Sequence, residues 1–302
     1  MHNIKANFDK ILVVIQDILG DEINEKGNYL RRGTVPKFSG IEVMALSLTA
    51  ECLSIDSENY LFSKLRKEYG KAFDNLISRR QYNDRRKLLF EKTENVRKLL
   101  SERLNRQADV VAIDSMPLEI CKLSREARNK MGKENERERP DKGYCASQKK
   151  YFYGYKLHSV CSSAGVIEAL DLTKASVHDV HYLKDVEELF SNCVITGDKG
   201  YIGREHQITL FETAGIRLEV PLRANQREAR PVMWILKKVR KRMETVFSQL
   251  CDQFMIQRNY AKSFAGFKSR VLAKITGLTL LQFLNKFVYN QPVGRVKHAL
   301  AN

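Results

Sequence analysis

Closely spaced cysteines are missing from this sequence. Its six cysteines are scattered, with no C-x-x-C pair and no histidine at the spacing of a zinc ligand. Disulfide-rich secreted domains and structural zinc sites are both built on such closely spaced residues. We therefore expect reduced thiols, and neither a disulfide framework nor a structural zinc site.

Long uninterrupted apolar runs are also missing. The first residues, MHNIKANFDKILVVIQDILG, alternate charged and apolar side chains and lack the cleavage site of a signal peptide. The most apolar late stretch, ITGLTLLQFLNKFVY, is interrupted by Gln282 and Lys286 and is too short to span a bilayer. The sequence thus predicts a cytoplasmic protein with no membrane partner.

Acidic residues are scarce relative to basic ones. The chain has 36 Asp and Glu against 52 Lys and Arg, a formal net charge of +16. Such an excess creates a field that attracts polyanions, which makes nucleic acid the first candidate partner. The alternative at this point is a protein that is merely soluble and basic.

Residues 1 to 105 have the pattern of an all-helical region. Apolar residues recur at helical spacing near the N-terminus: Phe8, Ile11, Leu12, Ile15, Ile18 and Leu19. Ser39 with Glu42, and Ser78 with Gln81, have the spacing of capping boxes that begin further helices.

Basic side chains crowd the helix that Ser78 begins. The segment SRRQYNDRRKLL contains Arg79, Arg80, Arg85, Arg86 and Lys87. Basic residues near the start of a helix suit the major groove in helix-turn-helix proteins. A run of charge on a helix is also typical of a solvated face, so both interpretations stay open.

The periodicity changes to that of strands after residue 108. Five segments are strand candidates: DVVAID, FYGYKLHSVC, VIEALDLT, CVITGD and IRLEVPL. Between the third and fourth, SVHDVHYLKDVEELF has a helical pattern that begins with Ser176 and Asp179 at capping-box spacing. Two long helices follow from about Pro231, which suits the first turn of the first of them. This order predicts an α/β protein with a mixed sheet covered by helices.

A polar insertion separates the first two strand candidates. Residues 122–150 contain ten Lys or Arg against five Asp or Glu. Such a segment cannot bury itself, so we expect a mobile loop that a polyanion would order.

Two aspartates each follow an apolar strand candidate. Asp114 ends DVVAID and Asp198 ends CVITGD, and each precedes a turn signal, Pro117 in one case and Gly200 in the other. Carboxylates at strand ends of such a sheet lie where ligands usually bind. Two adjacent carboxylates repel unless a cation lies between them, and Mg²⁺ or Mn²⁺ prefers oxygen ligands. The alternatives are a turn residue for Asp198 and a loop cap for Asp114.

A third acid is available in KKVRKRMETVFSQL. Glu244 lies beside the apolar stripe of this helix, within a run of basic residues. A surface pair with Arg240 is the alternative, but a glutamate placed after its cation is the weaker orientation, worth only about 0.2–0.5 kcal/mol. The helix therefore offers Glu244 as a metal ligand.

Five motifs, taken in order, resemble the catalytic domain of DDE transposases from bacterial insertion sequences. They are VVAIDSMP, YGYKLH, TKASVHD, VITGDKGY and RKRMETVF, and the N-terminal region is similar to the insertion sequence 982 family in particular. The resemblance implies a ribonuclease-H-like α/β fold, a mixed five-stranded sheet flanked by helices. It implies a helix-turn-helix-like DNA-binding region at 1–105, a catalytic domain at 106–290 with the insertion at about 122–150, and a tail at 291–302.

The same resemblance implies the residues of the site. Asp114, Asp198 and Glu244 would bind two Mg²⁺ or Mn²⁺ ions, and Tyr201 and Arg240 would support the site. Lys156 would hold a phosphate close to the metals, and His158 is either a further supporting residue or an ordinary half-buried strand residue. Further DNA contacts would come from the helix of Glu244, through Lys237, Lys238, Lys241 and Arg242. In a wider relative pattern tyrosine and lysine stand where this chain has Lys237 and Cys251.

The implied function is DNA transposition in the bacterial cytoplasm, at the nucleoid. The protein would bind the terminal inverted repeats of its element as a homodimer on double-stranded DNA. It would hydrolyse the ends and transfer the 3′ hydroxyls into target DNA, with no small-molecule substrate. Two alternatives stay open: a ribonuclease-H-like nuclease without strand transfer, and a catalytically inactive DNA-binding regulator.

Overall fold

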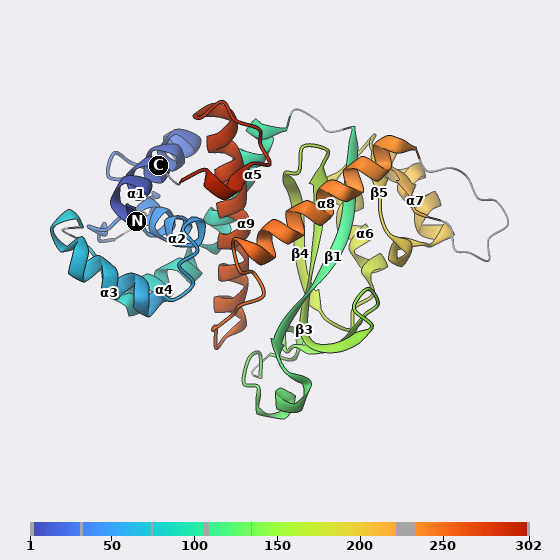
Figure 1. Cartoon of the computed structure of the whole chain (residues 1–302), viewed down its shortest axis with the longest axis horizontal. Helices are drawn as coiled ribbons and strands as arrows, with labels where there is room; N and C mark the ends of the chain where they lie inside the picture. The colour runs from blue at the N-terminus through green and yellow to red at the C-terminus, as the bar shows by residue number, and fades with distance from the viewer. Residues whose placement is uncertain are drawn as a thin grey trace. The chain divides into compact units, whose positions relative to one another are not determined.

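The computed structural model describes residues 3–30, 33–73, 75–105, 109–133, 135–221 and 233–300. The chain divides into two compact units (Figure 1). A helical unit comprises Met1–Leu104, Leu250–Ala261 and Ala265–Asn302, and a sheet unit comprises Asn105–Gln249 and Lys262–Phe264.

The helical unit confirms the helices expected in residues 1–105. Its helices are α1 (Ile4–Leu19), α2 (Gly40–Cys52), α3 (Glu58–Glu68), α4 (Arg79–Leu88), α5 (Phe90–Leu104) and most of α9 (Phe264–Phe287). Three short 3₁₀ helices accompany them: η1 (Gly20–Glu22), η2 (Gly70–Ala72) and η7 (Val296–His298). Both predicted capping boxes are present, with Ser39 and Glu42 at the start of α2 and Ser78 and Gln81 at the start of α4.

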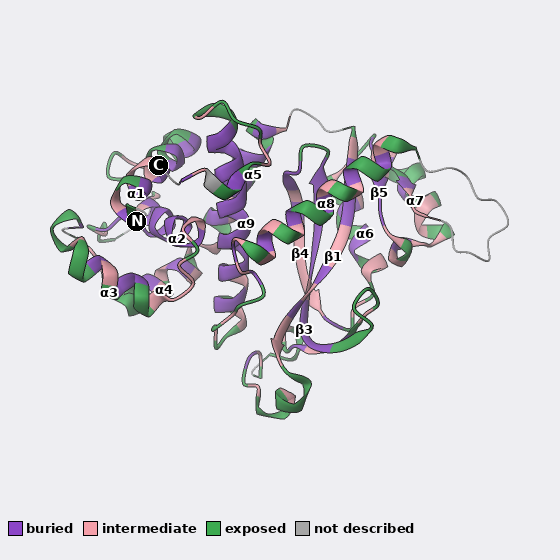
Figure 2. Ribbon diagram, viewed as in Figure 1, coloured by how far each residue is buried: buried purple, intermediate pink, exposed green. Residues whose placement is uncertain are grey.

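Helix α9 runs through the core of the helical unit, and Figure 2 shows it mostly in the colour of buried residues. It buries charge as well as apolar surface. Lys274 Nζ lies 2.6 Å from Glu51 Oε2 on α2 and donates to the carbonyl of Phe254, also at 2.6 Å. The predicted catalytic domain, 106–290, includes α9, whereas the structure groups most of this helix with the N-terminal helices. The functional bounds of the domains stay a prediction.

The sheet unit follows the predicted order of elements. Its strands are β1 (Val110–Cys121), β2 (Asp141–Cys145), β3 (Lys150–Ser162), β4 (Ile167–Lys174), β5 (Val194–Thr196) and β6 (Arg217–Glu219). Its helices are α6 (Leu183–Leu189), α7 (Arg204–Ala214) and α8 (Trp234–Asp252), the last of which ends in the helical unit. Four 3₁₀ helices complete it: η3 (Leu123–Arg128), η4 (Glu136–Glu138), η5 (Asp179–Tyr182) and η6 (Lys199–Tyr201). Pro231 lies outside the described residues.

The sheet is mixed, as predicted. Strand β1 pairs antiparallel with β3 and parallel with β5, and β6 continues parallel to β5. Strand β4 pairs antiparallel with one half of β3, and β2 pairs antiparallel with the other half. Five strands therefore form the core sheet, and β2 is a sixth strand contributed by the insertion. With helices on both sides, this is the ribonuclease-H-like arrangement that the sequence predicted.

The two faces of the sheet have different covers. Ile113 on β1 belongs to a buried apolar cluster that includes Val160 on β3, Ile195 on β5 and Tyr201 in η6. Helices α6 and α7 contribute Leu183, Val186 and Leu210 to it. Because side chains alternate along a strand, Asp114 points to the opposite face. Helix α8 approaches that face, since a Cβ on Gly165 at the β3–β4 turn would lie 2.8 Å from Cδ of Arg242.

Strand β1 corrects one prediction. It does not end at Asp114 but continues through Pro117 to Cys121, paired with β3 along this length. Pairing with β5 covers only Val110 to Ala112, so among the described strands β1 has no neighbour on that side at Pro117. Proline removes a backbone donor and is tolerated at such an edge, so Pro117 does not mark a turn.

The insertion at 122–150 also differs from the expected loop. Its described residues contain η3, η4 and strand β2, which pairs with β3 from Asp141 to Cys145. The charged residues stay at the surface while this ribbon extends the sheet, because β3 offers it a free edge.

No helix in the described ranges is sufficiently long and apolar to cross a membrane.

Candidate functional site

Asp114 and Asp198 meet beside the end of β5. In the parallel register Ala112 pairs with Thr196, so the two aspartates follow at equal steps along neighbouring strands. Asp198 then caps η6, where its Oδ1 accepts a 2.7 Å hydrogen bond from the backbone N–H of Gly200. Both aspartates are half-buried. The prediction that these two carboxylates share one location agrees with this register.

The pKa of Asp114 reflects this crowding. The pKa of its carboxyl is raised to about 7, mainly by burial and in smaller part by the negative charges of Asp198 and Asp179. The backbone N–H of Ser115, which donates to Oδ1 at 2.8 Å, opposes the rise, as does the charge of Arg240. A bound cation would relieve the repulsion between these acids.

Asp179 is an acid that the sequence analysis did not assign to the site. A Cβ added to Gly200 would lie 2.9 Å from Oδ1 of Asp198 and 3.3 Å from Oδ2 of Asp179. Glycine at position 200 therefore lets the two carboxylates approach the same turn. The signal that could have found Asp179 is its motif, TKASVHD, one of the five that carry the resemblance.

The capping role predicted for Ser176 and Asp179 is wrong. Ser176 donates its backbone N–H and its hydroxyl to Asp141. Asp179 accepts a hydrogen bond from Lys156 Nζ at 2.9 Å and forms an ion pair with it. His178 caps η5 instead, with Nδ1 accepting from the N–H of Val180 at 3.3 Å. Tertiary partners compete successfully with the local cap because η5 is a single short turn.

Lys156, predicted as a supporting residue, tethers this acidic corner to β3. Besides Asp179, its ammonium donates to the carbonyl of Val177 at 2.7 Å. Lys156 and Asp179 are both largely buried, with side-chain exposures of 14% and 22%. The lysine thus fixes the segment before η5 against the sheet.

Tyr201 and His158 are buried and feel the charges of the site. Burial, followed by the charges of Asp179, Asp114 and Asp198, raises the pKa of the Tyr201 phenol well above its usual value. Burial lowers the pKa of His158 to about 4, with Asp179 opposing and Lys156 adding to the effect. The imidazole Nε2 lies 2.8 Å from Thr173 Oγ1, which indicates a neutral structural histidine.

Helix α8 passes the site at Arg240. The positive charge of Arg240 lowers the pKa of Asp114. Glu244 is exposed one helical turn further along α8. Lys237, Lys238 and Lys241 are exposed on the same helix, and Arg242 is half-buried. Lys238 Nζ lies 5.7 Å from the ring of Trp234.

The donor chemistry of the site fits a hard cation in part. Carboxylate oxygens of Asp114 and Asp198 are the ligands that Mg²⁺ and Mn²⁺ prefer. Across the described ranges, however, no three His, Cys, Asp or Glu side chains are grouped closely enough to hold a metal ion. The two aspartates fit such an ion, and Glu244, the expected third ligand, is not close enough to complete a three-residue site with them.

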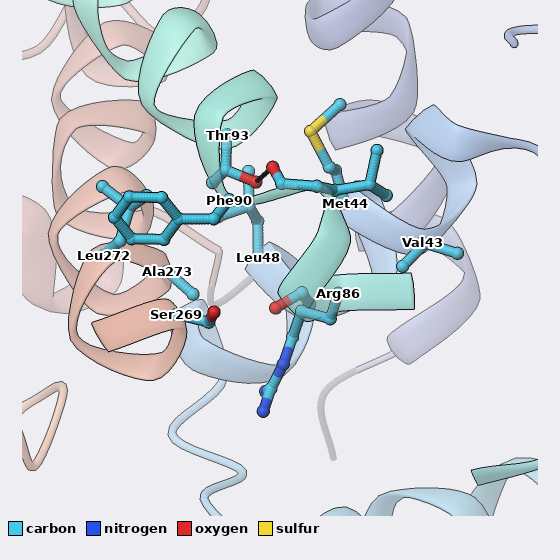
Figure 3. Close-up of a pocket in the computed structure, with 11 residues that line it drawn as sticks. Val43, Met44, Leu48, Arg86, Phe90, Thr93, Ser269, Leu272 and Ala273 are labelled. Carbon is cyan, nitrogen blue, oxygen red and sulfur yellow. Dashed lines mark hydrogen bonds between the residues drawn. The ribbon is translucent and has the colours of Figure 1, made fainter. Parts of the chain in front are cut away.

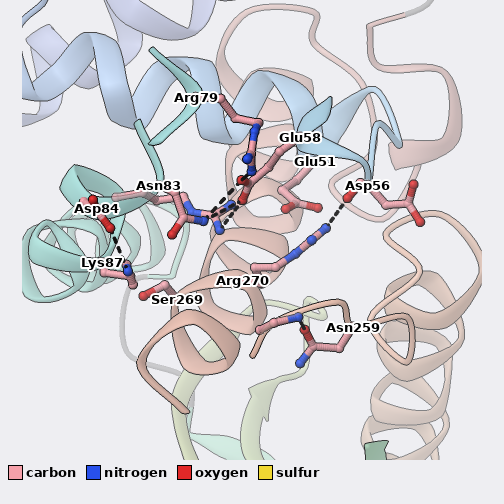
Figure 4. Close-up of polar contacts among 12 residues, drawn as sticks. Glu51, Asp56, Glu58, Arg79, Asn83, Asp84, Lys87, Asn259, Ser269 and Arg270 are labelled. Carbon is pink, nitrogen blue, oxygen red and sulfur yellow. Dashed lines mark hydrogen bonds and ion pairs between the residues drawn. The ribbon is translucent and has the colours of Figure 1, made fainter. Parts of the chain in front are cut away.

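The basic residues of α4 are divided between the surface and internal contacts. Arg86 is buried and lies 2.8 Å from Glu58 Oε1, and Arg85 donates to the carbonyl of Phe38 at 2.6 Å. Figure 4 shows Arg79 and Asn83 directed toward Glu58, and Lys87 paired with Asp84 at 2.9 Å. Arg79 and Arg80 are exposed at the start of the helix. A DNA-reading role for α4 stays a prediction, and Arg86 has a structural role in any case.

Two concavities lie outside the acidic site. One in the helical unit, between α2, α4, α5 and α9, measures about 10 Å³ (Figure 3). That is room for a single water molecule. The other, of about 540 Å³, lies at the insertion and is lined by Arg139, Lys142 and Lys174 but also by Glu126, Glu136 and Asp141. Basic and acidic side chains thus line this concavity together.

The family comparison agrees with this geometry. Residues 105–280, more than half of the chain, match the model of a transposase DDE domain. The comparisons with curated proteins and with solved structures gave no match. The matched range contains Asp114, Asp198 and Glu244 together with the sheet that carries the first two. The chain therefore belongs to the transposase DDE domain family.

Proposed function

We propose that this chain is the transposase of a bacterial insertion sequence, of the 982 family, and that it cuts and joins DNA at the ends of its element. The observation that carries the proposal is the approach of Asp114 and Asp198 at the end of β5, in a chain of the DDE family. The positive charge of the protein supports DNA as the substrate.

Asp114, Asp198 and Glu244 would hold the divalent ions, Mg²⁺ or Mn²⁺. When bound, two such ions activate an attacking oxygen and stabilise the leaving oxygen of a phosphodiester. Arg240, which already acts on Asp114, would hold a phosphate of the cleaved strand beside the acids. Glu244 would join the two aspartates from α8, which adjoins the same face of the sheet.

The cut consumes one phosphodiester bond, and the joining step that follows conserves their number. Water attacks the phosphorus at the end of the element, the P–O3′ bond breaks, and the 3′ oxygen takes a proton. The freed 3′ hydroxyl then attacks a phosphorus of target DNA, so one phosphodiester forms as another breaks. No covalent intermediate with the protein is needed in this sequence of steps.

The basic residues of α8 and the exposed arginines of α4, Arg79 and Arg80, would contact DNA phosphates. Such contacts make binding steeply dependent on salt, because bound phosphates release their counterions. Since both ends of the element must be held together, we propose a homodimer on DNA.

The test is Mg²⁺-dependent cleavage and joining of DNA that carries the repeats flanking the gene. We expect Asp198→Asn and Glu244→Gln to lose both steps while they retain end binding. Asp185→Asn, an exposed acid on α6, is the matched control and should keep full activity. Cleavage that survives Glu244→Gln would remove this residue from the site.

The two alternatives give different results in the same assay. Cleavage without any joined product, even at high concentrations of target DNA, would identify a nuclease. Binding without chemistry in the wild type, with either Mg²⁺ or Mn²⁺, would identify a regulator.

A further inference from the structure

The β2–β3 ribbon carries two exposed tyrosines that nothing in the proposed active site uses. Tyr144 and Tyr151 are directly paired across the two strands, and their ring centroids lie 5.0 Å apart at an interplanar angle of 55°. Their exposed fractions are 50% and 65%. Within the described residues neither hydroxyl has a hydrogen-bond partner.

The ribbon holds these rings in a fixed place. Gly143 lies so close to the sheet unit that a Cβ there would be 2.3 Å from the carbonyl oxygen of Ala175. Phe152, opposite Gly143, is buried. At the base of the ribbon, Asp141 accepts the backbone N–H of Ser176 at 2.9 Å and also its hydroxyl. The inward face is therefore anchored, and the outward face presents the tyrosine pair.

The charge around the pair favours a polyanion. Residues 142–151, KGYCASQKKY, include three lysines and no acid. Lys142 pairs with Glu126 at 2.8 Å and Lys150 with Glu119 at 3.5 Å, and both lysines are more than half exposed. Exposed ion pairs of this kind are worth at most about 1 kcal/mol, so they release their lysines readily to a phosphate.

We propose that the Tyr144–Tyr151 pair is a stacking platform for unpaired bases of DNA, with Lys142, Lys149 and Lys150 on the adjoining phosphates. Aromatic rings in a basic setting bind single strands because every base has a face that can stack. In an intact duplex those faces are covered by neighbouring bases. The ribbon should therefore prefer DNA whose end is opened. This inference rests on the proposed function, since it assigns the ribbon to the DNA that the transposase cuts.

The test compares two fluorescent DNAs, a blunt duplex and the same duplex with a single-stranded overhang, in anisotropy titrations. The Tyr144→Leu/Tyr151→Leu variant should lose about ten-fold or more in affinity for the overhang DNA, the range expected for one stacked base. It should bind the blunt duplex within about two-fold of the wild type, since duplex binding rests on phosphate contacts.

Two further proteins separate stacking from general damage to the fold. Tyr144→Phe/Tyr151→Phe keeps both rings and should bind the overhang as the wild type does. Tyr60→Leu, at an exposed tyrosine of α3 in the helical unit, should change neither affinity. A fluorescent adenine analogue in the overhang should be quenched by the wild type and the Phe variant, and not by the Leu variant.

Several outcomes would overturn the inference. Overhang binding that is unchanged in the Leu variant is one, and an equal loss in Tyr60→Leu is another. A Leu variant that keeps its DNA affinity but loses self-association in sedimentation would assign the pair to a second copy of this chain.

Cleavage of the same DNAs by the wild type is measured in parallel. If the wild type cleaves normally and the Leu variant binds the overhang as well as the wild type does, only the proposed role of the ribbon is contradicted. Weakened overhang binding in the Leu variant, with no cleavage by the wild type, contradicts the proposed function alone.

Discussion

The ammonium of Lys156 lies 2.9 Å from Oδ1 of Asp179, and the other oxygen of that carboxylate faces the Gly200 turn that Asp198 caps. One ion pair thus connects strand β3 to the turn that carries a proposed metal ligand. Groups that support metal ligands in this way are often worth about 10- to 100-fold in metal affinity or activity.

We expect Asp179→Asn to lower strand cleavage by about 10- to 100-fold, because the turn of Asp198 loses a fixed negative neighbour. The Mn²⁺ concentration for half-maximal cleavage should rise in the variant. Stabilisation of the variant by Ca²⁺ in thermal unfolding should weaken in parallel, which separates ion binding from chemistry. Asp185→Asn serves as the control, and equal Mn²⁺ dependence in Asp179→Asn and wild type would contradict the role.

The raised pKa of Asp114 predicts a pH dependence of stability. The pKa is about 7 in the folded protein and about 3.9 in an unfolded chain, so the folded state binds more protons between these values. The free energy of unfolding should therefore fall as pH rises from about 4 to about 7, by an amount of the order of a few kcal/mol.

Asp114→Asn should remove this contribution. Urea unfolding of both proteins between pH 5 and pH 8, in the absence of divalent ions, measures it. The variant should gain stability relative to the wild type as pH rises, and a difference that is independent of pH would show that Asp114 titrates normally.

Gly154 on β3 predicts a steric effect on the central sheet. A Cβ there would lie 2.1 Å from the carbonyl oxygen of Leu118 on β1, so Gly154→Ala forces the two strands apart. Overpacking of this kind costs about 1–3 kcal/mol or more. Gly70→Ala is the control, since nothing lies within 4 Å of its Cβ position. Equal midpoints for both variants in chemical unfolding would contradict the close approach.

The Lys274–Glu51 pair predicts a large penalty when one partner is removed. Both side chains are buried, with exposures of 2% and 4%, so Lys274→Met leaves an uncompensated carboxylate in the core. We expect a loss of about 3–5 kcal/mol in the free energy of unfolding. Adding Glu51→Gln should recover part of it, because the buried charge is then gone.

A surface pair provides the comparison for Lys274. Lys5 and Asp9 form a partly exposed pair on α1, and Lys5→Met should change the free energy of unfolding by at most about 1 kcal/mol. Similar losses in the free energy of unfolding for Lys5→Met and Lys274→Met would show that burial of the Lys274–Glu51 pair does not set the cost of breaking it.

Local patterns in the sequence predicted much of the fold. The capping boxes of α2 and α4 depend on residues three apart, and alternation or continuous apolar runs identify strands, so both signals survive in any tertiary setting. The order of strands and helices, and the places of Asp114 and Asp198 along it, follow from those signals. The five motifs then predicted the family that the transposase DDE domain match shows.

Contacts between distant residues decided the rest. Pro117 signals a turn locally, yet it lies inside β1 because the neighbouring strand β5 ends before it. Arg86 belongs to a basic run that suited either DNA or a solvated face, yet Glu58, twenty-eight positions away, holds its side chain in the core.

Asp179 shows the same limit at the site itself. By spacing alone it is a capping residue, and only the folded chain brings Lys156 and the Gly200 turn to its two oxygens. The sequence by itself determined which elements form and which acids end or follow the strands, because those depend on neighbours along the chain. Tertiary structure decided which charges meet, because an ion pair or a shared site depends on distances in space that no local pattern encodes.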